Sequence, residues 1–143
     1  MLYFLKVNIF QIQFLFMEGE PDLENFKKKI GFGIKFWLEF ENKSILGSGW
    51  ANLLKNIDEH EGGSLTQAAK ECNYSYKYAW NILKRIEKRT GVSPVETGKG
   101  GRGGGGWVRL NRMGKYLLKA YTDLQSEIDK IEKKLKDNLK MNY

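Results

Sequence analysis

Two helix-start signals lie close together in residues 62–89, and they constrain the fold of this chain more than any other feature of its sequence. Ser64 is an N-cap for the segment LTQAAKEC, and Gln67 completes a capping box with it. Ser75 is a second N-cap, for a helix expected over residues 76–89. A turn of about three residues joins the two helices, and the alanine pair in the first lets the second cross it closely. This arrangement predicts a helix-turn-helix.

A small β-hairpin and a further helix are predicted upstream of these two helices. Residues 34–46 alternate apolar and polar side chains about the turn ENK, which places Phe36, Leu38 and Phe40 on one face. Apolar side chains then recur at helical spacing over residues 50–60, which predicts a first helix there.

Downstream, the predicted order is strand, glycine-rich loop, strand. Val95 and Thr97 precede the loop GKGGRGGGG, and WVRL follows it. The loop formally matches a dinucleotide-binding fingerprint, but that motif must open a helix, and here it leads into a strand. We therefore exclude a nucleotide site. Lys99 and Arg102 are then two cations at a hairpin tip that can approach a sugar-phosphate backbone closely, the alternative being an unstructured glycine linker.

The positive charge of the chain is concentrated in its centre. The formal net charge is +7, and residues 62–116 hold eleven basic but only three acidic side chains. The segments before and after this stretch have net charges of −2 and +1. A concentrated positive field favours nucleic acid or an anionic surface as the partner. Together with the predicted helix-turn-helix, the expected partner is double-stranded DNA. A lysine-rich surface without a ligand would spread the charge more evenly.

The helix predicted over residues 76–89 has an apolar face and a cationic face. Its apolar positions follow an i, i+3, i+4, i+7 stripe that is expected to face the core: Ala79, Ile82, Leu83 and Ile86. Trp80, at the boundary of the two faces, is expected to pack against the body of the domain. A recognition helix reads bases with its N-terminal half and contacts phosphates along its flanks. The expected base-contacting residues are Ser75, Tyr76, Lys77 and Asn81, and the expected phosphate-contacting residues are Lys84, Arg85 and Lys88. The alternative is a solvated helix face.

Residues 112–141 form one long helical pattern. Its apolar side chains recur at alternating spacings of four and three, which satisfies a coiled-coil rule. A helix of about 30 residues extends about 45 Å, beyond the reach of a small domain, so a homodimer strut is expected rather than packing on the body alone. The expected dimerisation residues are Leu117, Tyr121, Leu124, Ile128, Ile131 and Leu135.

Catalytic and metal-binding functions are not supported by the residue types present. With Cys72 as the single cysteine and His60 as the single histidine, neither an internal disulfide nor a zinc cluster can form. No basic residue is evidently placed to activate the Cys72 thiol, and His60, between acidic neighbours, is expected to serve solubility. We therefore expect no enzyme, no metal and no cofactor.

The apolar segment 1–16 is too short and too often interrupted by polar residues to span a membrane, and it lacks the features of a signal peptide. It is either an extra β-strand or an overlong gene-start assignment, since an ordinary soluble sequence begins at Met17, and the second interpretation is favoured. No membrane association and a cytoplasmic location are expected.

The segments GSLTQAAKECNYSYKYAW, GKGGRGGGGWVRL and NRMGKYLLKAY resemble the N-terminal winged-helix domain of the molybdate-responsive ModE regulators, and more distantly LysR-type helix-turn-helix domains. They cover residues 63–121, and LGSGWANLLKNID extends the match weakly upstream. The resemblance implies a bacterial or archaeal transcription factor that dimerises through its long terminal helix. It places residues 75–77 at the start of the recognition helix and residues 99–106 in the wing.

Full-length ModE regulators also carry a C-terminal oxyanion-binding region. The sequence continues for only 27 residues beyond Tyr116, and the long helix occupies nearly all of them. The resemblance therefore implies DNA binding without an oxyanion-binding domain.

Together these features predict an α+β winged helix-turn-helix protein with a long C-terminal dimerisation helix. Residues 1–33 are an N-terminal extension, 34–116 the DNA-binding domain and 117–143 the dimerisation helix. The predicted function is sequence-specific transcriptional regulation as a homodimer. Two alternatives remain: a nonspecific architectural DNA-binding protein, favoured by the central charge, and a protein-interaction module that recruits a partner through the coiled coil.

Overall fold

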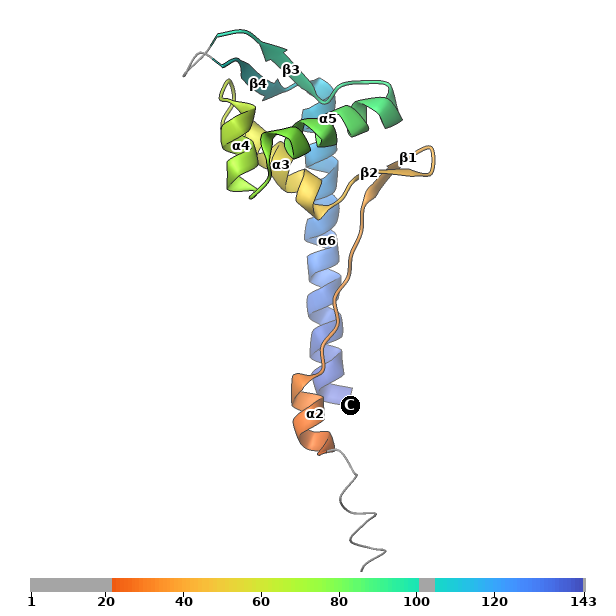
Figure 1. Cartoon of the computed structure of the whole chain (residues 1–143). Coiled ribbons are helices and arrows are strands. Elements are labelled where there is room, and N and C mark those ends of the chain that lie inside the picture. Colours follow the sequence, from red (N-terminus) through yellow and green to blue (C-terminus); the bar gives the residue numbers. More distant parts are fainter. Residues whose placement is uncertain (1–21, 101–104, 143) are drawn as a thin grey trace, which may run out of the picture. The chain divides into compact units, whose positions relative to one another are not determined.

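The structure, a computed structural model, describes residues 22–100 and 105–142. It consists of helices and two small antiparallel hairpins, which confirms the α+β class (Figure 1). In chain order the elements are α2 (Leu23–Lys29), β1 (Leu38–Phe40), β2 (Lys43–Leu46), α3 (Ser48–Glu59), α4 (Leu65–Glu71), α5 (Tyr76–Thr90), β3 (Val95–Gly98), β4 (Trp107–Leu110) and α6 (Arg112–Asn142).

The chain divides into two compact units, and the boundary between them falls inside α6. One unit is residues 34–131, which contain every element from β1 to β4 and most of α6. The other combines α2 with the end of α6 from residue 132. In this second unit, Asp22 caps α2 by accepting a 3.1 Å hydrogen bond from the Asn25 amide. No residue of α2 is buried.

Both predicted N-caps at the start of α4 and α5 are confirmed. Ser64 Oγ accepts a hydrogen bond from the Gln67 amide at 3.2 Å, and Ser75 Oγ accepts one from the Tyr78 amide at 3.1 Å. Each bond satisfies one of the amides that a helix start leaves without a backbone partner. At its other end α5 stops at Gly91, whose φ of +79° closes the helix in the left-handed conformation that glycine adopts without strain.

The turn between α4 and α5 is built around Asn73, which has a φ of +57°. Asparagine is one of the few residues other than glycine that tolerates this conformation. The amide of Tyr74 then donates to the carbonyl oxygen of Ala69 at 2.9 Å, which reverses the chain direction within three residues of the end of α4. Local interactions within residues 69–74 therefore stabilise the turn that joins the two helices.

The core of the 34–131 unit lies between α3, α4, α5 and the first turns of α6. Leu53, Leu54 and Ile57 of α3 are almost completely buried, as are Ile82 and Ile86 of α5. Ala68 and Ala69 of α4 are also buried, as expected for small side chains where α4 and α5 pack together.

The β3–β4 hairpin, at the top of Figure 1, is joined to the loop between α3 and α4. Its register pairs Val95 with Leu110 and Gly98 with Trp107. The Val108 amide donates to the carbonyl oxygen of Gly63 at 2.9 Å, so the β4 edge facing away from β3 also has a backbone partner. The strands predicted on either side of the glycine-rich loop are confirmed.

The expectation for the first hairpin is partly wrong. Phe36 and Leu38 pack against the core as predicted, but Phe40 is 39% exposed. Phe40 is the last residue of β1, next to the turn at Glu41 and Asn42, so it lies beyond the part of the hairpin that packs against the core. The bulge in this hairpin is in β2, because Leu38 pairs with Leu46 and Glu39 with Ser44, which leaves Ile45 without a partner on β1. Arg89 at the end of α5 donates to the Ser44 backbone carbonyl and also to its hydroxyl, and these contacts fix the hairpin on α5.

Helix α6 begins with an asparagine cap and a very close backbone approach. Asn111 Oδ1 accepts from the Gly114 amide at 2.9 Å, and Asn111 Nδ2 donates to the Ser93 carbonyl at 2.6 Å. Gly114 lies so close to Pro94 that a Cβ at this position would stand 2.1 Å from the Pro94 carbonyl oxygen. The segment before β3 therefore packs directly on the backbone of α6. Among the described helices, none is both long enough and apolar enough to cross a membrane.

Candidate nucleic-acid interface

The two faces of α5 are arranged as the sequence predicts. The apolar stripe is at most 2% exposed, and Trp80 at its edge is half-buried and packs against the core. The polar stripe opposite is exposed over the whole length of the helix. Its members are Lys77, Asn81, Lys84 and Lys88.

The start of α5 presents exposed polar and aromatic side chains. Ser75, Tyr76 and Lys77 are all exposed, with Tyr76 at 55%. The Ser75 oxygen accepts the capping bond from the Tyr78 amide, but its hydroxyl hydrogen remains available to a ligand. The first turn of the helix therefore offers donors at one end of the exposed stripe.

The three cations in the second half of α5 differ in their surroundings. Lys84 Nζ lies 2.8 Å from Glu87 Oε2 and 5.1 Å from the centre of the Trp80 ring. The Arg85 guanidinium lies 5.8 Å from the ring of Trp50 in α3, which holds its stem against the body of the unit. Lys88 is exposed, and no acidic side chain pairs with it among the described residues.

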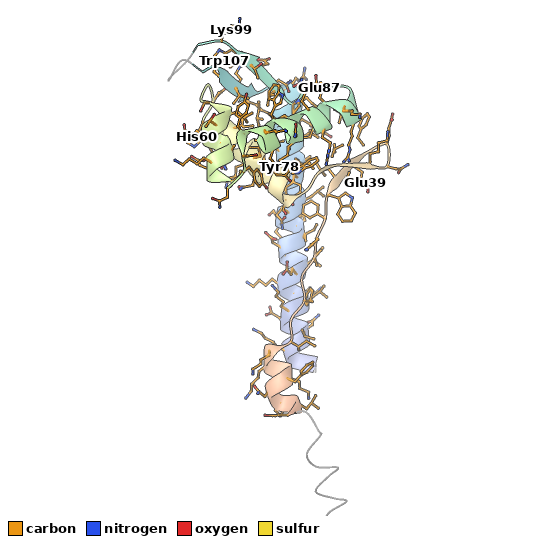
Figure 2. The ribbon with its side chains drawn as sticks, in the orientation of Figure 1. Glu39, His60, Tyr78, Glu87, Lys99 and Trp107 are labelled. Atoms are coloured by element: carbon orange, nitrogen blue, oxygen red, sulfur yellow. The ribbon has the colours of Figure 1, made fainter. Side chains whose placement is uncertain are left out.

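The β3–β4 hairpin adds further charged groups. Lys99 is exposed at the end of β3, and Figure 2 shows it on the same hairpin as Trp107. Arg102 lies outside the described residues. Arg109 is exposed on β4, where it forms a 2.8 Å ion pair with Glu96 and lies 5.1 Å from the centre of the Trp107 ring.

Arg109 is a candidate contact residue that the sequence reasoning missed. The alternation in WVRL contained the signal, because Val108 and Leu110 are buried and the residue between them must face outward. The sequence pattern places Trp107 in the strand and predicts no contact for its ring. Its ring lies over Gly98, where a Cβ would stand 2.5 Å from the indole, so the hairpin requires a glycine at position 98.

A polar cluster between α3 and α4 explains the environment of the single cysteine. Asn56 Nδ2 donates to Cys72 Sγ at 3.1 Å, and Asn52 approaches the same sulfur at 3.6 Å. Burial raises the pKa of the Cys72 thiol, which the Asn56 hydrogen bond only partly offsets. A thiol that stays protonated is a poor nucleophile. Within the described residues, no three His, Cys, Asp or Glu side chains form a group that could hold a metal ion.

His60 has a definite partner that sequence reasoning did not identify. Its Nε2 lies 2.8 Å from Glu71 Oε1, so it joins the end of α3 to the end of α4. The expectation that His60 serves only solubility overlooked this contact, because the two residues are eleven positions apart in sequence.

The apolar side chains along α6 divide into two groups. Leu117 and Tyr121 are 4% and 6% exposed, and they belong to the core of their own chain. Further along, Leu124, Ile131 and Leu135 are 46%, 52% and 43% exposed, while Ile128 is half-buried. The exposed part of the predicted seam therefore begins at Leu124.

The chain is similar to several regulators of the ModE type, although no family model matches it. It is 36% identical over 91 residues to the DNA-binding transcriptional dual regulator ModE of Escherichia coli, covering 64% of this chain and 33% of that protein. It is 38% identical over 86 residues to the transcriptional regulator ModE of Yersinia pestis, covering 60% and 32%. It is 30% identical over 80 residues to the molybdenum-pterin-binding protein MopB of Rhodobacter capsulatus, covering 56% and 29%.

These matches confirm the resemblance to ModE-type regulators that the motifs indicate. The match spans about a third of the length of each of these relatives. The relatives named ModE are described as transcriptional regulators, not as enzymes.

Proposed function

We propose that this chain is a sequence-specific, DNA-binding transcriptional regulator that acts as a homodimer. The observation that carries the proposal is the exposed cationic stripe of α5. Helix α5 is N-capped and directly follows a short turn and another N-capped helix, α4. A helix presented in this way fits the major groove, where base edges display a distinct pattern for each base pair. The similarity to regulators named ModE supports the same function.

The proposed fold is a winged helix-turn-helix over residues 34–116. In it, α4 and α5 are the helix pair and the β3–β4 hairpin is the wing. The hydrogen bond between Val108 and Gly63 supports this assignment, because it fixes the hairpin to the loop that precedes α4. The hairpin and α5 then belong to one packed unit, and both can contact one DNA duplex.

Within α5 we assign base contacts to the first half and phosphate contacts to the second. Ser75, Tyr76, Lys77 and Asn81 are the proposed base contacts. Asparagine is suited to this role because its amide pairs with two atoms of adenine. Lys84, Arg85 and Lys88 are the proposed phosphate contacts, together with Lys99 and Arg102 of the wing.

The proposed dimer seam runs along α6 within the predicted dimerisation helix 117–143. The burial of Leu117 and Tyr121 in their own core leaves Leu124, Ile128, Ile131 and Leu135 for contacts with a second chain. Apolar side chains at alternating spacings of four and three fit the seam of a two-stranded coiled coil. A two-fold dimer would bind two inverted half-sites separated by whole turns of DNA.

A second candidate function is nonspecific, architectural DNA binding. The net charge of +8 on residues 62–116 favours it, because phosphate neutralisation alone gives affinity without sequence preference. Such binding would depend on salt as strongly as specific binding does, but it would not distinguish an operator from random DNA.

In-vitro selection from a random DNA library, without added molybdate or tungstate, tests the proposal. We expect a palindromic consensus whose affinity exceeds that for random DNA by about 10³-fold or more. A salt titration on the selected and random duplexes measures the electrostatic share of each affinity. Recovery of no consensus, with equal affinities for both duplexes, would favour the architectural function. Absence of DNA binding at low salt would favour the remaining alternative, a protein-interaction module. A pull-down from nuclease-treated extract would then identify its partner.

A further inference from the structure

A cavity of about 580 Å³ lies at the beginning of α3. All of its walls belong to the 34–131 unit: the segment before β1, the junction of β2 and α3, the α4–α5 turn, the first turn of α5 and the first half of α6. Its volume falls within the range of small-molecule sites in proteins. None of the described residues that we propose to contact DNA lines it. The proposed function therefore leaves this cavity without a role.

Six of the fifteen residues that line the cavity are aromatic, and two pairs of them are held in fixed geometry. The rings of Phe36 and Tyr121 stack with centroids 4.5 Å apart and an interplanar angle of 15°. The rings of Tyr74 and Tyr78 meet edge to face, with centroids 4.9 Å apart. The full aromatic lining is Phe36, Trp37, Trp50, Tyr74, Tyr78 and Tyr121. Rigid rings around a concave space favour a planar aromatic occupant over a flexible one.

Trp37 is the most exposed of these aromatic residues, at 54%. Its indole Nε1 donates a 2.8 Å hydrogen bond to Oε1 of Glu39 (Figure 2). This hydrogen bond holds the exposed ring in one orientation. A large aromatic surface that is oriented but left open to solvent can be covered when a ligand binds.

The polar groups in the lining favour negative charge on the occupant. Lys35 is the only charged side chain in the lining and is exposed. Helix α3 begins at Gly47 with no side-chain cap, so the positive end of its dipole meets the cavity without a carboxylate to neutralise it.

The hydroxyl of Tyr74 lies against the backbone of Gly49 in this first turn, where a Cβ would stand 2.6 Å from it. Burial raises the pKa of Tyr74, so its hydroxyl remains protonated and able to donate a hydrogen bond. The Tyr121 hydroxyl already donates to Gln125 Oε1 at 3.4 Å. The lining therefore contains a hydroxyl donor, a cation and a helix N-terminus beside the aromatic side chains.

We infer that this cavity is a binding site for a planar aromatic carboxylate. The ring system lies among the aromatic side chains, and the carboxylate faces Lys35 and the first turn of α3. Because Tyr78 belongs to the first turn of α5 and lines the cavity, the occupant touches the helix that we propose contacts DNA (Figure 2).

Titration of the full chain with 2-naphthoate tests the site. The binding is monitored through the indole N–H signals in ¹⁵N-resolved NMR spectra. The chain has four tryptophans, and two of them, Trp37 and Trp50, line the cavity. We expect these two signals to shift with a common Kd of about 1 mM or tighter, the affinity typical of a ligand of this size. Trp80 and Trp107 are the internal controls, and their signals should not move. No shift up to about 10 mM, or equal shifts of all four signals, would overturn the inference.

Two further comparisons test the chemical class. Cyclohexanecarboxylate, which has the charge without the aromatic ring, and 2-naphthamide, which has the ring without the charge, should each bind more weakly than 2-naphthoate. Lys35→Ala should weaken 2-naphthoate binding about three- to fivefold and leave 2-naphthamide binding unchanged. Lys43→Ala, at the start of β2 and outside the cavity, is the matched control and should bind as the unmodified chain does. Equal affinity for all three probes would contradict the proposed class.

A second copy of the chain could fill the cavity instead, and protein concentration separates the two occupants. A true ligand site gives the same Kd for 2-naphthoate at low and high protein concentration. A Kd that weakens as the protein concentration rises would show that a second chain competes for the cavity, and it would overturn the inference.

Discussion

The Lys84 ammonium lies 2.8 Å from the carboxylate of Glu87, one turn further along the exposed side of α5 (Figure 2). Lys88, four residues beyond Lys84, has no such acidic partner among the described residues. The side chains of the Lys84–Glu87 pair are 54% and 38% exposed, so the interaction is screened by water. The pair still opposes a DNA phosphate, because Lys84 must exchange its carboxylate partner for the phosphate.

Replacing Lys88 with Ala should therefore reduce DNA affinity more than replacing Lys84. We expect either variant to lower the slope of log K against log salt by about one unit, equally for all DNA sequences. Glu87→Gln should increase affinity, because it removes a negative charge beside the phosphates. Fluorescence anisotropy at several salt concentrations measures these effects. Lys130→Ala, which removes a lysine from a similar pair on α6, is the control. Loss at a single base position would contradict the assignment to phosphate.

Asn81→Ala should change sequence preference rather than overall affinity. If the amide pairs with one adenine, its loss costs about 1–3 kcal/mol of discrimination at that position and little elsewhere. Binding assays on a set of operators with single base changes would locate the position. A uniform loss on every duplex would remove Asn81 from the base-contacting group.

Neutralising Lys99 and Arg102 together should reduce DNA affinity and leave the fold intact. Lys99 is exposed at the tip of the β3–β4 hairpin and contributes nothing to the core. Circular dichroism and thermal unfolding should match the unmodified chain. Lys43→Ala, on the other hairpin, controls for the loss of a positive charge. An unfolded double variant would show that the loop is structural.

Leu124→Lys should dissociate the proposed homodimer. Leu124 is 46% exposed within one chain, so a lysine there is compatible with the folded monomer but places charge in the seam. Sedimentation should show a monomer with reduced operator affinity. Ser126→Lys, also exposed on α6, adds the same charge outside the apolar stripe and should leave the dimer unchanged. An unchanged dimer in Leu124→Lys would rule out this seam.

Gly114→Ala should destabilise the 34–131 unit by about 1–3 kcal/mol, because the new methyl group would overlap the Pro94 carbonyl and force the segment before β3 away from α6. Chemical denaturation measures the free energy of unfolding. Gly105→Ala is the control, since a Cβ there meets no atom within 4 Å. Equal stabilities of the two variants would contradict the close packing of Pro94 on α6.

Much of the local structure follows from short sequence signals. Ser64 and Ser75 form their capping bonds with residues three positions away, and such bonds require only the local backbone. The two faces of α5 follow from helical periodicity, which separates Ile82 from Asn81 whatever else the chain does. The strands on either side of the glycine-rich loop also follow from a local signal, the strand-like residues that flank the loop.

Other features depend on which segments meet in three dimensions. Phe40 is exposed because it lies at the turn end of β1, beyond the core, although the alternation around it is regular. The periodicity of α6 is the same on both sides of Leu124, and no sequence signal separates its buried part from its exposed part. The first part of α6 is buried by the core of the 34–131 unit, and Phe36, 85 positions before Tyr121, stacks on it there.

The sequence by itself determined the helices, their caps and the cationic face of α5, because each depends on interactions over a few residues. Only the tertiary structure decided that His60 meets Glu71, that six aromatic side chains surround one cavity, and that Tyr121 belongs to its own core. These are contacts between distant parts of the chain. Their geometry depends on how whole elements pack, and periodicity within one element carries no information about its neighbours.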